Sequence, residues 1–243
     1  MIVSSTTGNV TTIELAREEK RNALNEAMVQ DLSQAFTAAV DGGARVIVLT
    51  GRGKVFSAGA DLSGPVYDET FLDQHVRLIE QIEATPVPVI AALNGAALGA
   101  GLQLAMAADL RVLVPEALAG IPAAKIGVAI DEWTVRRLTS LVGAGTAGGM
   151  LIGCDPLTAD RALALGFANR LGGLHEAQRW AAEIAEFAPL TLRHYKMVFN
   201  GDGARDEAPA ERVAAMRAAW LSEDVQEARA ARAEKRQPVF TGR

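Results

Sequence analysis

The chain has 243 residues, 49% of them hydrophobic and 22% charged, which is typical of a globular protein with a sizeable core. A net charge of −5 argues against a general nucleic-acid-binding surface. A single cysteine, Cys154, excludes a disulfide within the chain, and no apolar run reaches the length of a transmembrane helix. Because the N-terminal segment also lacks a signal-peptide pattern, we expect a cytoplasmic protein without a membrane span.

The predicted elements begin with a hairpin, continue as alternating helices and strands, and end as helices. Strands are expected at residues 2–5, 10–15, 46–50, 87–93, 110–114 and 168–171. Helices are expected at residues 26–40, 70–84, 102–108, 133–141 and 159–165, and over most of the chain from residue 175 onward. Residues 51–62, rich in glycine and other small residues, are expected to form a loop, and residues 122–130 a strand or a loop.

This order implies an α/β core with helices packed outside it and a helical layer at the C-terminus. The core is expected to span residues 1–188. The C-terminal helical region, residues 189–243, begins at Pro189 and is expected to act as a lid or in oligomerisation.

The most informative segment is Pro86–Asp109, PVPVIAALNGAALGAGLQLAMAAD. A strand that leads through a glycine-rich turn into a helix leaves unpaired N–H groups at the helix start, which can bind negative charge. The dinucleotide fingerprint does not fit, because Leu104 replaces its third glycine, and a phosphate-binding loop fails because Val48 replaces its first. The alternative is that the glycines only allow close packing of helix and strand.

Five segments together resemble the enoyl-CoA hydratase/isomerase (crotonase) family, in the family's order and over nearly the whole chain. They are KRNALN (20–25), VIVLTGRGKVFSAGADL (46–62), PVPVIAALNGAALGAGLQLAMAAD (86–109), PLTADRALALGFANRL (156–171) and EKRQPVF (234–240). The resemblance implies a crotonase-like spiral of strand–strand–helix turns with a C-terminal helical region. It also implies an acyl-CoA ligand, no cofactor beyond the CoA moiety of that ligand, and assembly into homotrimers or hexamers.

The resemblance further implies an oxyanion hole, made by two backbone N–H groups that hold the thioester oxygen. They match Ala60, in SAGAD, and Ala100, in GAGLQ. Small residues at these positions let a thioester approach the backbone, and Ala100 lies at a predicted helix start, so the chemistry agrees with the match.

CoA-binding residues follow from the same resemblance. Ala58, Asp61 and Leu62 should lie against the adenine end of CoA. Lys20 and Arg21 should approach the CoA phosphates, and Lys235 should reach the nucleotide from a neighbouring subunit. The alternative for the charged residues is that they are simply solvated on an exposed loop and helix.

The chain departs from the hydratase pattern at both catalytic positions. The two hydratase glutamates match Gln103 and Ala123 here. A carboxamide does not exchange a proton near neutral pH and alanine offers no polar group, so hydration should be very slow and isomerisation weakened.

Two further acids, Asp131 and Glu132, lie in the loop that enters the helix at Trp133. Asp131 roughly matches the nucleophile of the related dehalogenase branch, although capping of the helix is the favoured role. The three histidines, His75, His175 and His194, lack the spacing of a metal site or a catalytic triad, and Asp109 is interpreted as structural. Either Arg136 or Arg137 could reach an acyl carbonyl or a partner, although exposure on the helix surface is the favoured role.

We therefore expect a protein of lipid metabolism that binds fatty acyl-CoA with little or no hydratase activity. The alternative is an active enoyl-CoA hydratase/isomerase-type enzyme, of the lyase or isomerase class, that uses Asp131 or Glu132.

Overall fold

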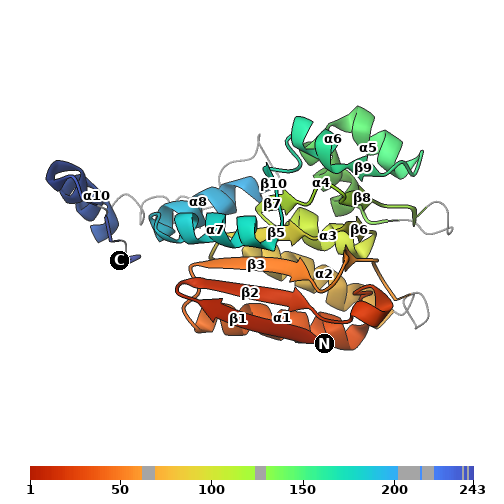
Figure 1. The fold of residues 1–243 in the computed structure, drawn as a ribbon, viewed down its shortest axis with the longest axis horizontal. Helices are drawn as coiled ribbons and strands as arrows, with labels where there is room; N and C mark the ends of the chain where they lie inside the picture. Colours follow the sequence, from red (N-terminus) through yellow and green to blue (C-terminus); the bar gives the residue numbers. More distant parts are fainter. Residues whose placement is uncertain (62–68, 124–129, 202–213, 215–221, 237, 240) are drawn as a thin grey trace.

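The computed structural model describes residues 1–61, 69–123, 130–201, 214, 222–236, 238–239 and 241–243. Its centre is a six-stranded sheet with strand order β1-β2-β3-β5-β7-β10 (Figure 1). β1 is antiparallel to β2, and the other neighbouring strands are parallel. These strands are β1 (Ile2–Thr7), β2 (Val10–Leu15), β3 (Val46–Gly51), β5 (Val89–Leu93), β7 (Leu110–Leu113) and β10 (Arg170–Leu171).

A second sheet has the order β4-β6-β8-β9 and consists of very short strands. They are β4 (Val55–Ser57), β6 (Ala96–Leu98), β8 (Leu118–Gly120) and β9 (Leu157–Thr158). The helices are α1 (Glu26–Asp41), α2 (Glu69–Ala84), α3 (Ala100–Ala107), α4 (Glu132–Val142), α5 (Ala144–Leu151), α6 (Ala159–Ala164), α7 (Leu174–Ala185), α8 (Pro189–Phe199) and α10 (Glu223–Glu234), with a 3-10 turn at Glu18–Lys20.

The two sheets grow together, because successive units each add one strand to each sheet and then a helix. The units are β3-β4-α2, β5-β6-α3 and β7-β8-α4. This repeat confirms the predicted α/β spiral of strand–strand–helix turns.

β3 shows why the larger sheet is covered on both faces. Alternate side chains point to opposite faces of a strand. Ile47 and Leu49 belong to the main core with α1 and α2, whereas Val46 and Val48 pack against α7 on the other face. Alanines let α7 lie close to the sheet. The side chains of these four β3 residues are fully buried, as predicted for this strand.

Local signals predicted several elements correctly. The hairpin closes through Gly8 and Asn9, since Thr7 pairs with Val10. Asn25 caps α1 by accepting a hydrogen bond from the Met28 N–H at 3.0 Å.

The short strands of the second sheet were not predicted. β4 lies inside the expected loop 51–62, and β6 separates the Asn94-Gly95 turn from Gly99, so β5 does not lead directly into α3. β8 and α5 were also missed. Strands of three residues are too short to show a period of two, and these strands pair with partners from other units of the spiral.

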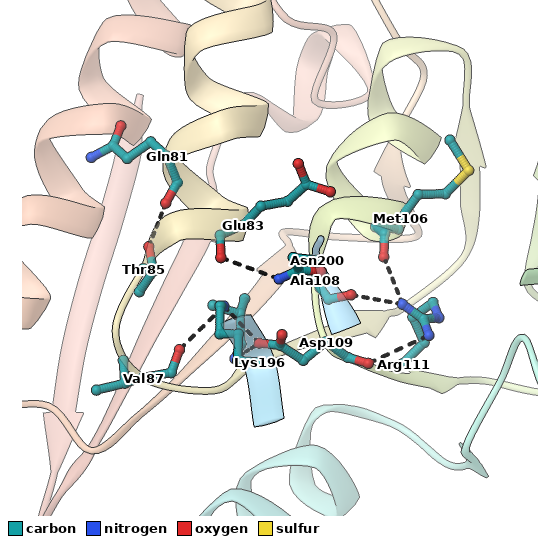
Figure 2. A network of polar contacts seen from close by, with 12 residues as sticks. Gln81, Glu83, Thr85, Val87, Met106, Ala108, Asp109, Arg111, Lys196 and Asn200 are labelled. Atoms are coloured by element: carbon teal, nitrogen blue, oxygen red, sulfur yellow. Dashed lines mark hydrogen bonds and ion pairs between the residues drawn. The ribbon is translucent and has the colours of Figure 1, made fainter. Parts of the chain in front are cut away.

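α8 is tied to the core at the start of β5. Lys196 of α8, 5% exposed, donates to Asp109 Oδ2 at 2.7 Å and to the Val87 carbonyl at 3.3 Å (Figure 2). Asp109 Oδ2 also accepts from the Val89 N–H at 2.7 Å, so this aspartate is structural, as expected. The boundary at residue 189 stays a prediction. Within the described residues, no helix combines the length and apolarity that crossing a bilayer requires.

Candidate functional site

The candidate site is built around two Gly-Ala pairs that lie at equivalent places in successive units. Ser57 of β4 pairs with Ala97 of β6, so Gly59-Ala60 and Gly99-Ala100 follow their strands at nearly the same offset. Both glycines have positive φ, +94° and +50°. A Cβ atom on Gly59 would lie 2.7 Å from the Leu98 carbonyl oxygen and 3.5 Å from the Ala100 nitrogen, so the two turns are in contact.

The N–H groups of Ala60 and Ala100 are both oriented away from local backbone partners. Leu24 forms a parallel bridge with Ala60 through the neighbouring peptides, Leu24 N–H to Gly59 O and Asp61 N–H to Leu24 O, each 2.8 Å. The N–H of Ala60 itself therefore points to the other side. Ala100 is the first residue of α3, where an N–H has no acceptor within the helix and the helix dipole is positive. That these two donors hold one thioester oxygen stays a prediction.

Gln103 lies one turn below Ala100 on the same face of α3. Its Nε2 donates to Asp131 Oδ2 at 3.0 Å and to Thr134 Oγ1 at 2.6 Å. Its Oε1 is 2.9 Å from His75 Nε2, so His75 must be the donor in that contact. Both N–H groups of the amide are therefore committed to α4, and its oxygen to α2.

His75 is held as a neutral ring. The side chain is 5% exposed and stacks on Phe71, with ring centroids 6.0 Å apart. Its Nδ1 is buried and makes no hydrogen bond to the described part of the chain. Burial lowers the pKa of His75, although the contact with Gln103 and the nearby Asp131 carboxylate oppose the shift.

Asp131 is the end point of this hydrogen-bond chain. Its Oδ1 accepts from the Thr134 N–H at 2.8 Å, and its Oδ2 accepts from the Thr134 hydroxyl at 2.7 Å as well as from Gln103. Asp131 is thus the N-cap of α4, as favoured from the sequence. Both carboxylate oxygens of Asp131 are therefore engaged, by three donors in all, at the N-terminus of α4.

Lowering the pH should destabilise the protein through His75. The unfolded chain binds a proton near pH 6.5, whereas the pKa of buried His75 is lower. The stability from this group is complete above pH 6.5 and is lost as the pH falls below it, by ~1.4 kcal/mol for each unit between the two pKa values. Urea unfolding at about pH 7.5 and 5.5 should show a smaller loss for His75→Phe, which keeps a flat ring but cannot titrate. Equal losses in the two proteins would contradict this assignment.

The predicted CoA-binding residues of the N-terminal half lie together. The Ala58 N–H donates to the Arg21 carbonyl at 3.0 Å, which joins the loop after the 3-10 turn to the loop after β4. Lys20 is exposed on that turn. The Asp61 carboxylate is paired with Arg17 Nη1 at 2.6 Å, with side chains 11% and 15% exposed.

The sequence also predicts four site positions elsewhere in the chain, namely Leu62, Ala123, Glu132 and Lys235. Leu62 lies outside the described residues, and of Glu132 the structure gives the backbone position, at the start of α4. Lys235 is exposed directly after α10, and its contact with a neighbouring subunit stays a prediction. Ala123 is half-buried against the main core. Among the residues that the structure describes, no group of His, Cys, Asp and Glu side chains could hold a metal ion.

The family model for enoyl-CoA hydratase/isomerase matches residues 5–243. This chain belongs to the enoyl-CoA hydratase/isomerase family. Two curated relatives named probable enoyl-CoA hydratase echA6, from Mycobacterium bovis and Mycobacterium leprae, are 52% identical over 233 residues and 50% identical over 237 residues. Each alignment covers 96% of this chain and 96% of the relative. A solved enoyl-CoA hydratase from Bacillus anthracis superimposes with a TM-score of 0.89 at 28% identity, covering 100% of this chain and 99% of that one.

That Gln103 and Ala123 stand at the positions of the two hydratase glutamates stays a prediction from the resemblance. The structure adds His75 and Thr134, which sequence reasoning did not place in the site. A signal for His75 was present: Phe71, His75, Leu78 and Ile82 recur at helical spacing and share the buried face of α2. A polar residue on a buried helix face requires a partner, and Gln103 is that partner.

Proposed function

We propose that this member of the enoyl-CoA hydratase/isomerase family binds fatty acyl-CoA thioesters in lipid metabolism and has little or no hydratase activity. The observation that carries the proposal is the Gln103 amide, whose two N–H groups donate to Asp131 and Thr134 and whose oxygen accepts from His75. Hydration of a double bond requires groups that take up and release a proton, and neither this amide nor Ala123 can do so. Each lost acid–base group typically lowers the rate by about 10²- to 10⁴-fold.

Binding of the thioester rests on the part of the site that is retained. The Ala60 and Ala100 N–H groups are oriented away from local acceptors, and the Gly-Ala turns bring the two loops into contact. An oxygen that gains negative character is stabilised by fixed donors of this kind.

Titration with CoA thioesters of increasing acyl length, with product analysis on the same samples, tests the proposal. We expect micromolar or tighter binding and negligible turnover of crotonyl-CoA. Rapid hydration of crotonyl-CoA would overturn the proposal.

Ala100→Pro provides a sharp variant, because proline is tolerated at the first helical position and removes the N–H. It should weaken binding of the thioester but not of free CoA. The matched control is Ala144→Pro, since α5 also has eight residues and also starts after a glycine of positive φ, Gly143. Equal effects of the two variants on thioester binding would show that the Ala100 N–H does not contact the thioester.

A second candidate function is catalysis that uses Asp131 or Glu132. The observation in its favour is that the exposed Asp131 carboxylate lies beside the Gln103 amide, with 3.0 Å between Oδ2 and Nε2. Asp131→Asn or Glu132→Gln should then abolish turnover of a CoA thioester. Turnover that survives both substitutions would exclude both functions.

We also propose assembly into homotrimers or hexamers, on the family resemblance. Sedimentation equilibrium of the full chain distinguishes the two, and a monomer would contradict both.

A further inference from the structure

Arg111 lies at the end of α3 opposite Ala100. It is 3% exposed, and its side chain extends from β7 into the space beyond the helix. Its guanidinium donates to the carbonyls of Ala105 and Ala108, at 3.4 and 2.8 Å, and to that of Phe167 at 2.6 Å. The last carbonyls of a helix lack partners within it, so Arg111 satisfies groups that burial would otherwise leave unpaired. Burial lowers the pKa of Arg111 to about 10, so it remains a cation at neutral pH.

Arg137 reaches the same helix end from α4. Its Nε donates to the Met106 carbonyl at 3.0 Å, and its Nη2 lies 3.4 Å from Asn200 Oδ1 of the turn that ends α8. Asn200 in turn donates to the Glu83 carbonyl at the end of α2, at 3.2 Å (Figure 2). The expectation that both Arg136 and Arg137 lie on the surface is therefore wrong for Arg137, which is half-buried, and right for its exposed neighbour.

Two physical effects connect these arginines with the N–H of Ala100. α3 has eight residues and would not be stable alone, so contacts at its far end help to fix its direction. Cations at a helix C-terminus also interact favourably with the helix dipole. α3 is only ~12 Å long, and solvent screens the charge of a buried cation only partly, so part of its positive potential extends to Ala100 at the other end of the helix. The nearby Asp109 carboxylate is already paired with Lys196, which leaves the charges of both guanidinium groups in place.

We propose that Arg111 and Arg137 are positioning residues for the oxyanion donor: they hold the C-terminal end of α3, so that the Ala100 N–H keeps its direction and its electrostatic strength. The inference rests on the proposed function, because it requires a thioester oxygen at Ala100.

The test uses Arg137, because the fully buried Arg111 is more sensitive to replacement. An acyl-CoA with a ¹³C-labelled thioester carbonyl is bound to the full chain, and its carbonyl stretching frequency is measured by difference infrared spectroscopy. In the wild-type protein the bound carbonyl should absorb at a lower frequency than in free acyl-CoA, because the N–H donors polarise it. In Arg137→Gln the frequency should move back toward the free value. Affinity for the thioester, relative to free CoA, should fall by no more than roughly fivefold, because that is the largest effect typical of a cation at the helix end it contacts and the effect is smaller at the far end.

Arg136→Gln is the matched control, because it makes the same exchange one residue earlier on α4 and should leave both values unchanged. Arg137→Lys keeps the positive charge but lacks the planar guanidinium group, so it should keep part of the change in carbonyl frequency seen in the wild-type protein. This variant also provides a test if Arg137→Gln does not fold.

A wild-type frequency that Arg137→Gln and Arg137→Lys both retain would overturn the inference. A bound carbonyl that absorbs at the free value in the wild-type protein would also overturn it, while leaving acyl-CoA binding intact. Absence of any acyl-CoA binding would overturn the proposed function and the inference with it.

Discussion

Exchanging the amide and the carboxylate between positions 103 and 131 should restore most of the stability that either single substitution removes. Gln103→Glu puts a second carboxylate at the 3.0 Å contact with Asp131 Oδ2, where a donor is required. Asp131→Asn replaces one carboxylate oxygen with an NH2 group, so either Gln103 Nε2 or the Thr134 N–H loses its acceptor. We expect each to cost about 1–3 kcal/mol of unfolding free energy. In the double variant one amide again donates to one carboxylate, and His75 still donates to position 103.

Urea unfolding of the four proteins at pH 7 measures this coupling, which should be favourable by about 1–2 kcal/mol. Additive losses would show that the contact between residues 103 and 131 carries no net energy. At lower pH the loss in Gln103→Glu should shrink, because one proton can then be shared by the two carboxylates.

The same exchange bears on activity. Gln103→Glu with Ala123→Glu puts carboxylates at both positions that the family resemblance assigns to the hydratase glutamates. The carboxylate introduced at position 103 would lie against Asp131 and share a proton with it. We expect poor hydration of crotonyl-CoA by this variant, and roughly 10²-fold faster hydration once Asp131→Asn is added. Full activity of the first variant would show that Asp131 does not restrict position 103.

Lys196→Met should be among the most destabilising single substitutions in the described chain. The pair formed by Lys196 Nζ and Asp109 Oδ2 is buried, with side chains 4% and 17% exposed. Removing one partner of such a pair leaves the other charge unpaired, at a cost of about 3–5 kcal/mol. Asp109→Asn should act similarly by stranding the lysine, and the double variant should be more stable than the sum of the single losses predicts.

Arg179→Met is the control, because this exposed arginine of α7 pairs with Glu176 and Glu183 at the surface and its loss should leave the unfolding midpoint almost unchanged. Thermal unfolding of Lys196→Met also tests the predicted boundary at residue 189. A single, lowered transition would show that α8 unfolds together with the core, whereas a separate early transition would support an independent C-terminal region.

Sequence reasoning recovered the elements that carry their own signals. The turn after Thr7, the cap at Asn25 and the apolar strand around Ile47 depend on neighbouring residues, and local chemistry is enough to predict them. The strands β4, β6 and β8 depend on one another. They have three residues each, and their partners lie in other units of the spiral, so no local pattern revealed them.

The site divides in the same way. The sequence by itself determined which chemical groups are present: an amide at Gln103, no acid at position 123, and glycines before Ala60 and Ala100. Only the tertiary structure decided which groups meet. The pairing of β4 with β6 brings the two Gly-Ala turns together, and the packing of α2, α3 and α4 joins His75, Gln103 and Asp131. The physical reason is that contacts between residues 28 or more positions apart follow from how the elements pack, which spacing along the chain does not encode.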